Sequence, residues 1–156
     1  MKTAVFVDVQ NIYYTTRETY GRPFNYRRFW ENLSQEHEIV AAYAYAIDRG
    51  DQGQQKFQSA LKHIGFELKL KPFIQRADGS AKGDWDVGIT IDVLSWAASV
   101  EQIVLLSGDG DFEILVDHVQ QNFGNYCKVV SVAPLSAQVL IRRANDHHNI
   151  GPSDLL

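Results

Sequence analysis

Short apolar runs alternate with helical stretches along the whole chain. The apolar runs have the length of buried strands and cover residues 3–7, 39–47, 66–70, 103–106 and 126–132. Between them, apolar residues recur with the spacing of one helix face in the stretches 26–33, 57–64, 84–98, 112–123 and 135–144. Strands that alternate with helices favour a mostly parallel sheet with helices on both faces. We therefore predict a single three-layer α/β domain with about five strands.

Length and composition limit the class of protein. A chain of 156 residues is long enough to bury a core as one domain, and 45% hydrophobic and 22% charged residues are typical of globular proteins. The single cysteine, Cys127, excludes a disulfide framework and fits a reducing compartment. No apolar run approaches the roughly 20 residues that span a bilayer. We expect a cytoplasmic protein with no membrane partner.

The net charge argues against one kind of nucleic-acid binder. At −4, with a pI of about 5.7, the chain lacks the basic surface of a protein that coats DNA or RNA. The same charge is compatible with an enzyme whose acidic site holds cations that then meet phosphates.

Carboxylates stand at the ends of two apolar runs. Asp8 ends the first run, and Asp109 and Asp111 follow the fourth in the turn 107–112. The carboxyl ends of strands in an open α/β sheet share the edge at which ligands bind. Asp109 and Asp111 are therefore either helix-capping residues or part of a metal site, and a bare buried Asp8 would be costly. Asn11 belongs to the residue types that cap helices.

The helical stretch 84–98 is apolar nearly all round, which predicts a largely buried helix. It nevertheless carries Asp84, Asp86 and Asp92. Asp84 and Asp86 lie where a helix dipole favours negative charge, but Asp92 lies in the middle of the helix. Carboxylates that converge repel one another unless a cation neutralises them. A ligand set made only of oxygens suits Mg²⁺ or Mn²⁺.

Other functions of the Asp109 turn fail on detail. An EF-hand loop that starts at Asp109 needs Gly and Glu where this chain has Ile114 and Gln120. A dinucleotide fingerprint needs G-x-G-x-x-G after the first strand, and the chain has Asp8-Val9-Gln10-Asn11 there. The sequence also lacks a Walker A motif.

Three elements in this order carry a family resemblance. They are Asp8-Val9-Gln10-Asn11 after the first strand, Asp86-Val87 and Asp92 on the central helix, and Ser107-Gly108-Asp109-Gly110-Asp111-Phe112. Together they resemble the NYN domain, the LabA-like group of the PIN-like metal-dependent ribonucleases. The resemblance covers nearly the whole chain. It implies a domain over residues 1–150, followed by a C-terminal tail, 151–156.

The resemblance also implies a site. The fold would be Rossmann-like, with the first and fourth strands as neighbours. The four residues that would act as catalytic groups and ligands of one or two Mg²⁺ or Mn²⁺ ions are Asp8, Asp86, Asp109 and Asp111. Asn11 would position a phosphate or a ligand water, and Ser107 would line the same pocket.

One departure from the family pattern concerns the start of the central helix. Family members often have Lys-Gly-x-Asp-Val, whereas Lys82-Gly83-Asp84-Trp85-Asp86-Val87 is one residue longer. The choice between Asp84 and Asp86 stays open, and Asp86 is favoured because Asp92 then keeps its spacing. The surrounding stretch 56–82 is locally positive, either as a solvated surface or as a patch that guides an RNA backbone. Arg76 and Lys82 are the candidates for that second role.

These observations lead to one main hypothesis and two alternatives. We expect a metal-dependent ribonuclease that hydrolyses single-stranded or structured RNA, endonucleolytically, by metal-activated water. One alternative is a catalytically quiet domain of the same fold that binds RNA or a protein. The other is a haloacid-dehalogenase-like phosphatase, although this chain has Gln10 where that group needs its second Asp. The oligomeric state stays open, a homo-oligomer included.

Overall fold

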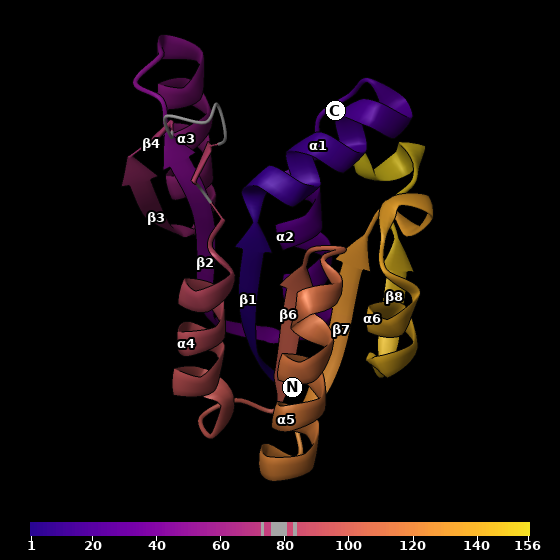
Figure 1. Cartoon of the computed structure of the whole chain (residues 1–156). Coiled ribbons are helices and arrows are strands. Elements are labelled where there is room, and N and C mark those ends of the chain that lie inside the picture. The colour runs from indigo at the N-terminus through magenta and orange to yellow at the C-terminus, as the bar shows by residue number, and fades with distance from the viewer. Residues whose placement is uncertain (73, 76–80, 83) are drawn as a thin grey trace.

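The computed structural model describes residues 1–72, 74–75, 81–82 and 84–156. Its central feature is a parallel sheet of six strands in the order β3-β2-β1-β6-β7-β8 (Figure 1). The strands are β1 (Lys2–Asp8), β2 (Glu38–Asp48), β3 (Glu67–Pro72), β6 (Gln102–Leu106), β7 (Tyr126–Ser131) and β8 (Asp146–Asn149). A separate antiparallel pair consists of β4 (Ile74–Gln75) and β5 (Ala81–Lys82).

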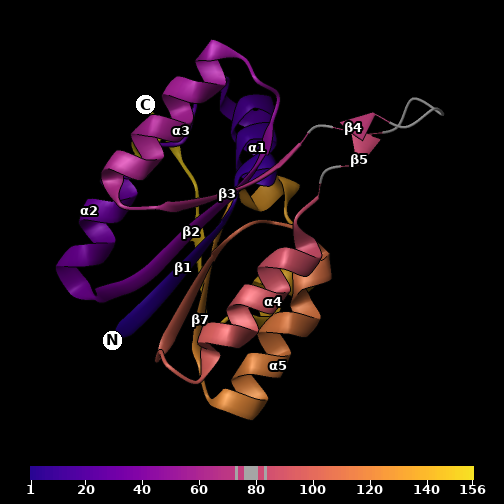
Figure 2. The same ribbon diagram turned by 90° about the vertical axis from the view of Figure 1, so that its left-hand side faces the viewer.

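Helices cover both faces of the sheet. Figure 2 shows α2 and α3 on one side of the strands and α4 and α5 on the other. The helices are α1 (Val9–Tyr20), α2 (Tyr26–Glu36), α3 (Gln52–Ile64), α4 (Asp86–Ala97), α5 (Glu113–Phe123) and α6 (Gln138–Arg143). Short 3₁₀ turns are η1 (Gly110–Phe112), η2 (Ala133–Leu135) and η3 (Pro152–Asp154). The predicted three-layer α/β fold is confirmed.

The core consists of two hydrophobic layers, one on each side of the sheet. Successive side chains of a strand point to opposite faces, and β1 follows this rule. Val5 and Val7 pack in the layer under α1, α2 and α3, whereas Ala4 and Phe6 pack in the layer under α4 and α5. A strand that is buried on both faces reads as a continuous apolar run, which is why β1 was recognisable in the sequence.

The strand order changes direction between β1 and β6. The chain adds β2 and β3 on one side of β1, then crosses back through α4 and adds β6, β7 and β8 on the other side. The neighbouring position of β1 and β6 agrees with what the family resemblance implied. Ligands of open α/β sheets bind at the carboxyl ends of strands where the order reverses. A ligand site is therefore expected at the end of β1.

The sheet has one strand more than the sequence predicted. The additional strand is β8, whose residues Asp-His-His-Asn are polar and partly exposed. It is an edge strand that pairs with β7 through its backbone, so its side chains do not need to be apolar. The last residues also pack onto the domain, since Leu155 is buried and bridges to Phe24.

The α4 helix is buried along one face only, whereas the sequence predicted a largely buried helix. Ile89 and Val93 are buried against the sheet, but Val87 and Ile91 on the outer face are 71% and 57% exposed. The prediction of a largely buried helix was wrong because a helix in an outer layer of this architecture contacts the sheet along one face only. Within the described residues, no helix, α4 included, has the length and apolar character that a membrane span requires.

Candidate metal centre

Three aspartates from distant parts of the chain meet at the carboxyl edge of the sheet. Asp8 ends β1, Asp86 begins α4, and Asp109 follows β6. Each offers one carboxylate oxygen, and these oxygens lie within 4.8 Å of one another. The register of the sheet explains part of this, since Val7 pairs with Leu106 and the next residues of both strands leave the sheet side by side.

Asp8 has a structural role as well as a place in the cluster. Its Oδ1 accepts a hydrogen bond from the backbone N–H of Asn11 at 3.5 Å, which makes Asp8 the N-cap of α1. The sequence had offered Asn11 as a cap, and that reading was wrong because Asn11 is the third residue of the helix. A cap of this kind fixes the aspartate at the junction of strand and helix.

Two polar side chains connect the ends of β1 and β6. Ser107 Oγ donates to Asp8 Oδ2 at 3.0 Å and accepts from the backbone N–H of Asp109 at 3.2 Å. Asn11 Oδ1 accepts from the backbone N–H of Gly108 at 2.9 Å. Ser107 is fully buried, so its hydroxyl depends on these partners. Ser107 and Asn11, two of the four predicted substrate-binding residues, thus lie at the cluster, where they hold the two chain segments together. Their contact with substrate stays a prediction.

Gly108 and Gly110 bring the turn close to the segment before α6. A Cβ atom on Gly108 would lie 2.5 Å from Ser136 Oγ and 3.1 Å from Ser136 Cα, and one on Gly110 would lie 2.8 Å from Ala137 Cβ. The backbone N–H of Ala137 also donates to the Gly108 carbonyl at 3.0 Å. Sequence reasoning missed this support, and its only signal was the small residues of the Ser-Gly-Asp-Gly turn.

The cluster is electrostatically strained. Burial raises the pKa of Asp8 to about 6, against the opposing effect of the hydrogen bonds from Ser107 and Asn11. Burial also raises the pKa of Asp86 to about 7, helped by a hydrogen bond with Asp109 and by the negative charges of Asp109, Asp84 and Asp8. Both shifts follow from burial of the carboxyl groups, with the neighbouring negative charges adding to it.

The donor set fits a hard divalent cation. All three converging groups are carboxylates, and Mg²⁺ and Mn²⁺ prefer oxygen ligands. A cation at this position would favour the charged carboxylates and so oppose the burial and the repulsion that raise the two pKa values. Asp8, Asp86 and Asp109 are the residues that would hold such an ion.

The other acidic candidates have different surroundings. Asp111 is exposed and lies outside the group of three, although its backbone N–H donates to Asp109 Oδ1 at 2.9 Å and it borders a small cavity together with Asp86. Asp84 is exposed, and its Oδ1 accepts from the backbone N–H of Asp86 at 3.3 Å. Asp92 points elsewhere: its Oδ2 lies 2.6 Å from Lys69 Nζ and 2.7 Å from Tyr45 Oη.

Of the two basic candidates, Lys82 and Arg76, only Lys82 lies within the described residues. Lys82 lies in β5, of which the structure describes the backbone course. Arg76 lies outside the described residues. Their roles toward RNA stay predictions.

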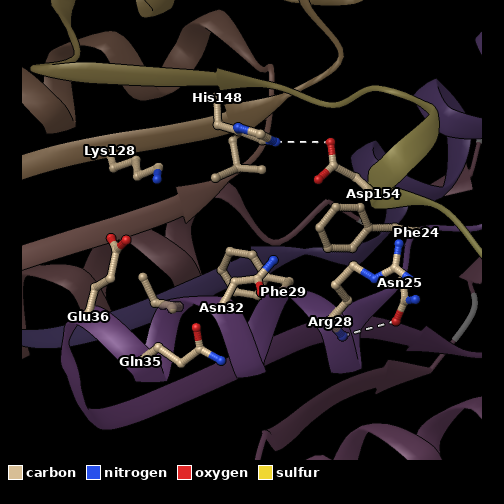
Figure 3. Close-up of a pocket in the computed structure, with 12 residues that line it drawn as sticks. Phe24, Asn25, Arg28, Phe29, Asn32, Gln35, Glu36, Lys128, His148 and Asp154 are labelled. Carbon is tan, nitrogen blue, oxygen red and sulfur yellow. Dashed lines mark hydrogen bonds and ion pairs between the residues drawn. The ribbon is translucent and has the colours of Figure 1, made fainter.

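A cavity of about 350 Å³ lies away from the aspartates, between α2 and the strands β7 and β8 (Figure 3). Figure 3 shows the His148 ring turned toward Asp154, and the two groups are 2.9 Å apart. Arg28 donates to the carbonyl oxygen of Ser153 at 2.6 Å. Because these charged groups have protein partners, and no member of the aspartate cluster lines the cavity, it is not the candidate catalytic site.

Comparisons with known proteins support the fold and identify the family. A protein from Vibrio parahaemolyticus of unknown function has a crystal structure that superposes with a TM-score of 0.94. It is 49% identical in sequence, and the match covers 99% of this chain and 96% of that one. The low amplitude and bright protein LabA of Synechococcus elongatus is 30% identical over 155 residues, which cover 94% of this chain and 82% of LabA. The NYN domain family model matches residues 2–151. The chain therefore belongs to the NYN domain family.

Proposed function

We propose that this protein is a metal-dependent ribonuclease that hydrolyses phosphodiester bonds of RNA endonucleolytically. The observation that carries the proposal is the convergence of Asp8, Asp86 and Asp109 at the reversal point of the sheet. Membership of the NYN family supports it, since domains of this family are generally nucleases associated with RNA.

The residues have distinct roles in this proposal. Asp8 and Asp109 would hold a Mg²⁺ or Mn²⁺ ion from the ends of neighbouring strands, and Asp86 would complete the group from the start of α4. Such an ion would supply a water nucleophile at neutral pH and neutralise charge on the phosphate. Asp111, which is exposed and borders a small cavity with Asp86, would hold a ligand water or a second ion. Ser107 and Asn11 connect the Asp8 carboxylate and the start of α1 to the backbone of Gly108 and Asp109, before an ion binds.

The test is cleavage of RNA by the purified protein in the presence of Mn²⁺ or Mg²⁺. We expect fluorescently labelled RNA to be cut internally, chelator to stop the reaction, and Asp109→Asn to lower the rate at least 100-fold. Asp146→Asn is the matched control, because it makes the same chemical change on β8, where Asp146 faces Lys128. Circular dichroism spectra and thermal unfolding must show that both variants fold.

The outcomes separate the hypotheses. Undiminished cleavage by Asp109→Asn would contradict the proposed site. RNA binding without any cleavage, at metal concentrations that saturate the protein, would favour the catalytically quiet domain. Turnover of a small phosphomonoester with no cleavage of RNA would favour the phosphatase.

A further inference from the structure

A second cavity is lined by residues that begin directly after Asp8 in the chain. It has a volume of about 320 Å³ and lies between the N-terminal halves of α1 and α3, at the end of β2. Its α1 wall contains Val9, the residue that directly follows Asp8 in the chain, and Tyr13, one turn further along. The volume is within the range of about 300–1,000 Å³ found for small-molecule sites. The metal centre described above uses none of the side chains that line this cavity.

The lining combines an apolar surface with several amides. Val9, Ile47 and Phe57 supply apolar surface, and Gln10, Gln54 and Gln58 add side-chain amides. The charged residues Arg49 and Asp51 complete the lining at the end of β2. Such a lining suits a flat heteroaromatic ring whose edges carry donors and acceptors. Glutamine is one of the side chains that hydrogen-bond to base edges.

One of these amides lacks a partner. Gln58 Nε2 is buried and forms no hydrogen bond within the described residues. Gln54, one helical turn earlier, is satisfied: its Oε1 accepts from the backbone N–H of Arg49 at 2.6 Å, and its Nε2 donates to the carbonyl of Ile47. Buried amides almost always have partners in folded proteins. Because Gln58 lines the cavity, a rotation of its flexible side chain would bring this unpaired donor to an acceptor that enters from outside the chain.

An aromatic ring stands at the border of the same cavity. Tyr13 is 58% exposed, so much of its ring is open to solvent. Arg17 holds it in place, because Arg17 Nη1 donates to Tyr13 Oη at 3.1 Å and the guanidinium lies 5.9 Å from the ring centroid. A fixed, exposed aromatic face is the surface on which an unpaired base stacks.

We propose that this cavity binds one nucleobase of an unpaired RNA strand, next to the phosphodiester that lies at the aspartate cluster. Tyr13 stacks on the base, and Gln58 Nε2 donates to an acceptor on its edge. The inference rests on the proposed ribonuclease function and deepens it by naming the substrate class. A base inside a duplex cannot enter such a cavity without leaving the stack, so single-stranded RNA is the expected substrate.

The first test measures base binding without any cleavage. The metal-free, ¹⁵N-labelled protein is titrated with AMP, GMP, CMP and UMP at millimolar concentrations, with ribose 5-phosphate as the probe that lacks a base. We expect at least one nucleotide to shift the side-chain amide signals of Gln54 and Gln58 with saturation, and ribose 5-phosphate to leave them unchanged. If no nucleotide shifts these signals more than ribose 5-phosphate does, the inference is wrong.

Two pairs of variants locate the binding. Tyr13→Ala and Gln58→Leu should each weaken nucleotide binding roughly tenfold, as expected for the loss of one stacking or hydrogen-bonding contact. Tyr14→Ala and Gln55→Leu are the matched controls, because Tyr14 is equally exposed, Gln55 lies on the same helix as Gln58, and neither lines the cavity. Equal weakening by the controls would overturn the inference. Unchanged melting temperatures show that the variants fold. If Gln58→Leu does not fold, Tyr13→Ala decides the outcome.

A second test separates this inference from the proposed function. Suppose nucleotide binding weakens in Tyr13→Ala and Gln58→Leu but not in the two controls, and RNA is not cleaved. That result would leave the cavity assigned and contradict the nuclease. Cleavage of single-stranded RNA with the same base preference in the wild type and in Gln58→Leu would leave the nuclease standing and overturn the role of the cavity. We expect the wild type to favour one base at a fixed distance from the cut, and Gln58→Leu to lower that preference roughly tenfold.

Discussion

The side-chain oxygen of Asn11 accepts a hydrogen bond from the backbone N–H of Gly108 at 2.9 Å, across 97 positions of the chain. This contact joins the first turn of α1 to the loop after β6. Ser107 adds a second connection, because its hydroxyl bonds to Asp8 and to the backbone of Asp109. Neutral groups thus hold the Asp8 carboxylate and the backbone that carries Asp109 in place, and neither contact neutralises a carboxylate charge.

Loss of the Asn11 connection should weaken both the fold and the metal centre. We expect Asn11→Ala to lower the free energy of unfolding by about 1–2 kcal/mol, since it leaves a partly buried N–H without its acceptor. The affinity for Mn²⁺ should fall as well, because Asp8 and Asp109 lose part of their fixed relation. Urea denaturation and Mn²⁺ titration measure the two effects. The exposed Asn32→Ala serves as control, and an equal response of both variants would contradict the assigned role.

The stability of the metal-free protein should depend on pH through Asp8. Its pKa is about 6 in the folded state against 3.8 as the reference value, so the folded state binds more protons than the unfolded state between pH 4 and 6. Stability therefore falls as pH rises through this window, by about 3 kcal/mol from this group. Asp86, whose pKa is raised to about 7, acts in the same direction.

A comparison with Asp8→Asn isolates this effect from the other acidic groups. The difference in unfolding free energy between the variant and the wild type should grow in favour of the variant from pH 4.5 to pH 7.5, in buffer with chelator. A constant difference over that range would show that Asp8 titrates normally.

Asp86→Asn should stabilise the metal-free protein and abolish its response to metal. The substitution removes one of three repelling carboxylates, so the melting temperature without metal should rise above that of the wild type. Saturating Mn²⁺ should stabilise the wild type, by about 2.7 kcal/mol at 100 times the dissociation constant, and should leave the variant unchanged. Differential scanning calorimetry with and without Mn²⁺ measures both. A wild-type response in the variant would exclude Asp86 as a ligand.

The turn after β6 should not tolerate a larger residue at position 108. A Cβ on Gly108 would come within 3.1 Å of the Ser136 backbone, so Gly108→Ala must displace the turn that carries Asp109. We expect a loss of about 1–3 kcal/mol in unfolding free energy and weaker binding of Mn²⁺. Gly151→Ala is the control, because a Cβ there meets nothing within 4 Å. Unchanged stability of Gly108→Ala would show that the neighbouring segment gives way.

Asp92 should matter for stability alone. Its carboxylate bonds to Lys69 and to the Tyr45 hydroxyl between α4 and the sheet. We expect Asp92→Ala to lower the free energy of unfolding by about 2 kcal/mol, while the dissociation constant for Mn²⁺ changes less than twofold. Isothermal titration calorimetry and urea denaturation separate the two readouts. A large loss of metal affinity would place Asp92 at the site after all.

The sequence carried enough information for the fold and for the position of the site. Strands β1 and β6 were recognisable because residues buried on both faces form unbroken apolar runs. Since the two strands are parallel neighbours, Asp8 at the end of β1 and Asp109 three residues after β6 reach the same edge. Asp86 could be favoured only through the family resemblance. The charge of Asp92 looked unexplained from sequence because its partner, Lys69, lies on a strand 23 positions away.

Other features depend on tertiary contacts that leave little trace in the sequence. The strand β8 forms from polar residues because an edge strand needs only backbone pairing. The outer face of α4 stays exposed although it is apolar, because burial depends on which layer the helix occupies. The contact of Gly108 with Ser136 joins segments whose proximity follows from the placement of α6. The unpaired amide of Gln58 became visible only once the cavity between α1 and α3 was formed.

The central claim is that Asp8, Asp86 and Asp109 hold a divalent cation. Crystals of the protein grown with Mn²⁺ and measured near the manganese absorption edge test it directly. The account predicts an anomalous peak bonded to oxygens of all three carboxylates, and no peak at that position in crystals of Asp109→Asn. Saturating Mn²⁺ with no peak among these aspartates, or a peak coordinated by other residues only, would contradict it.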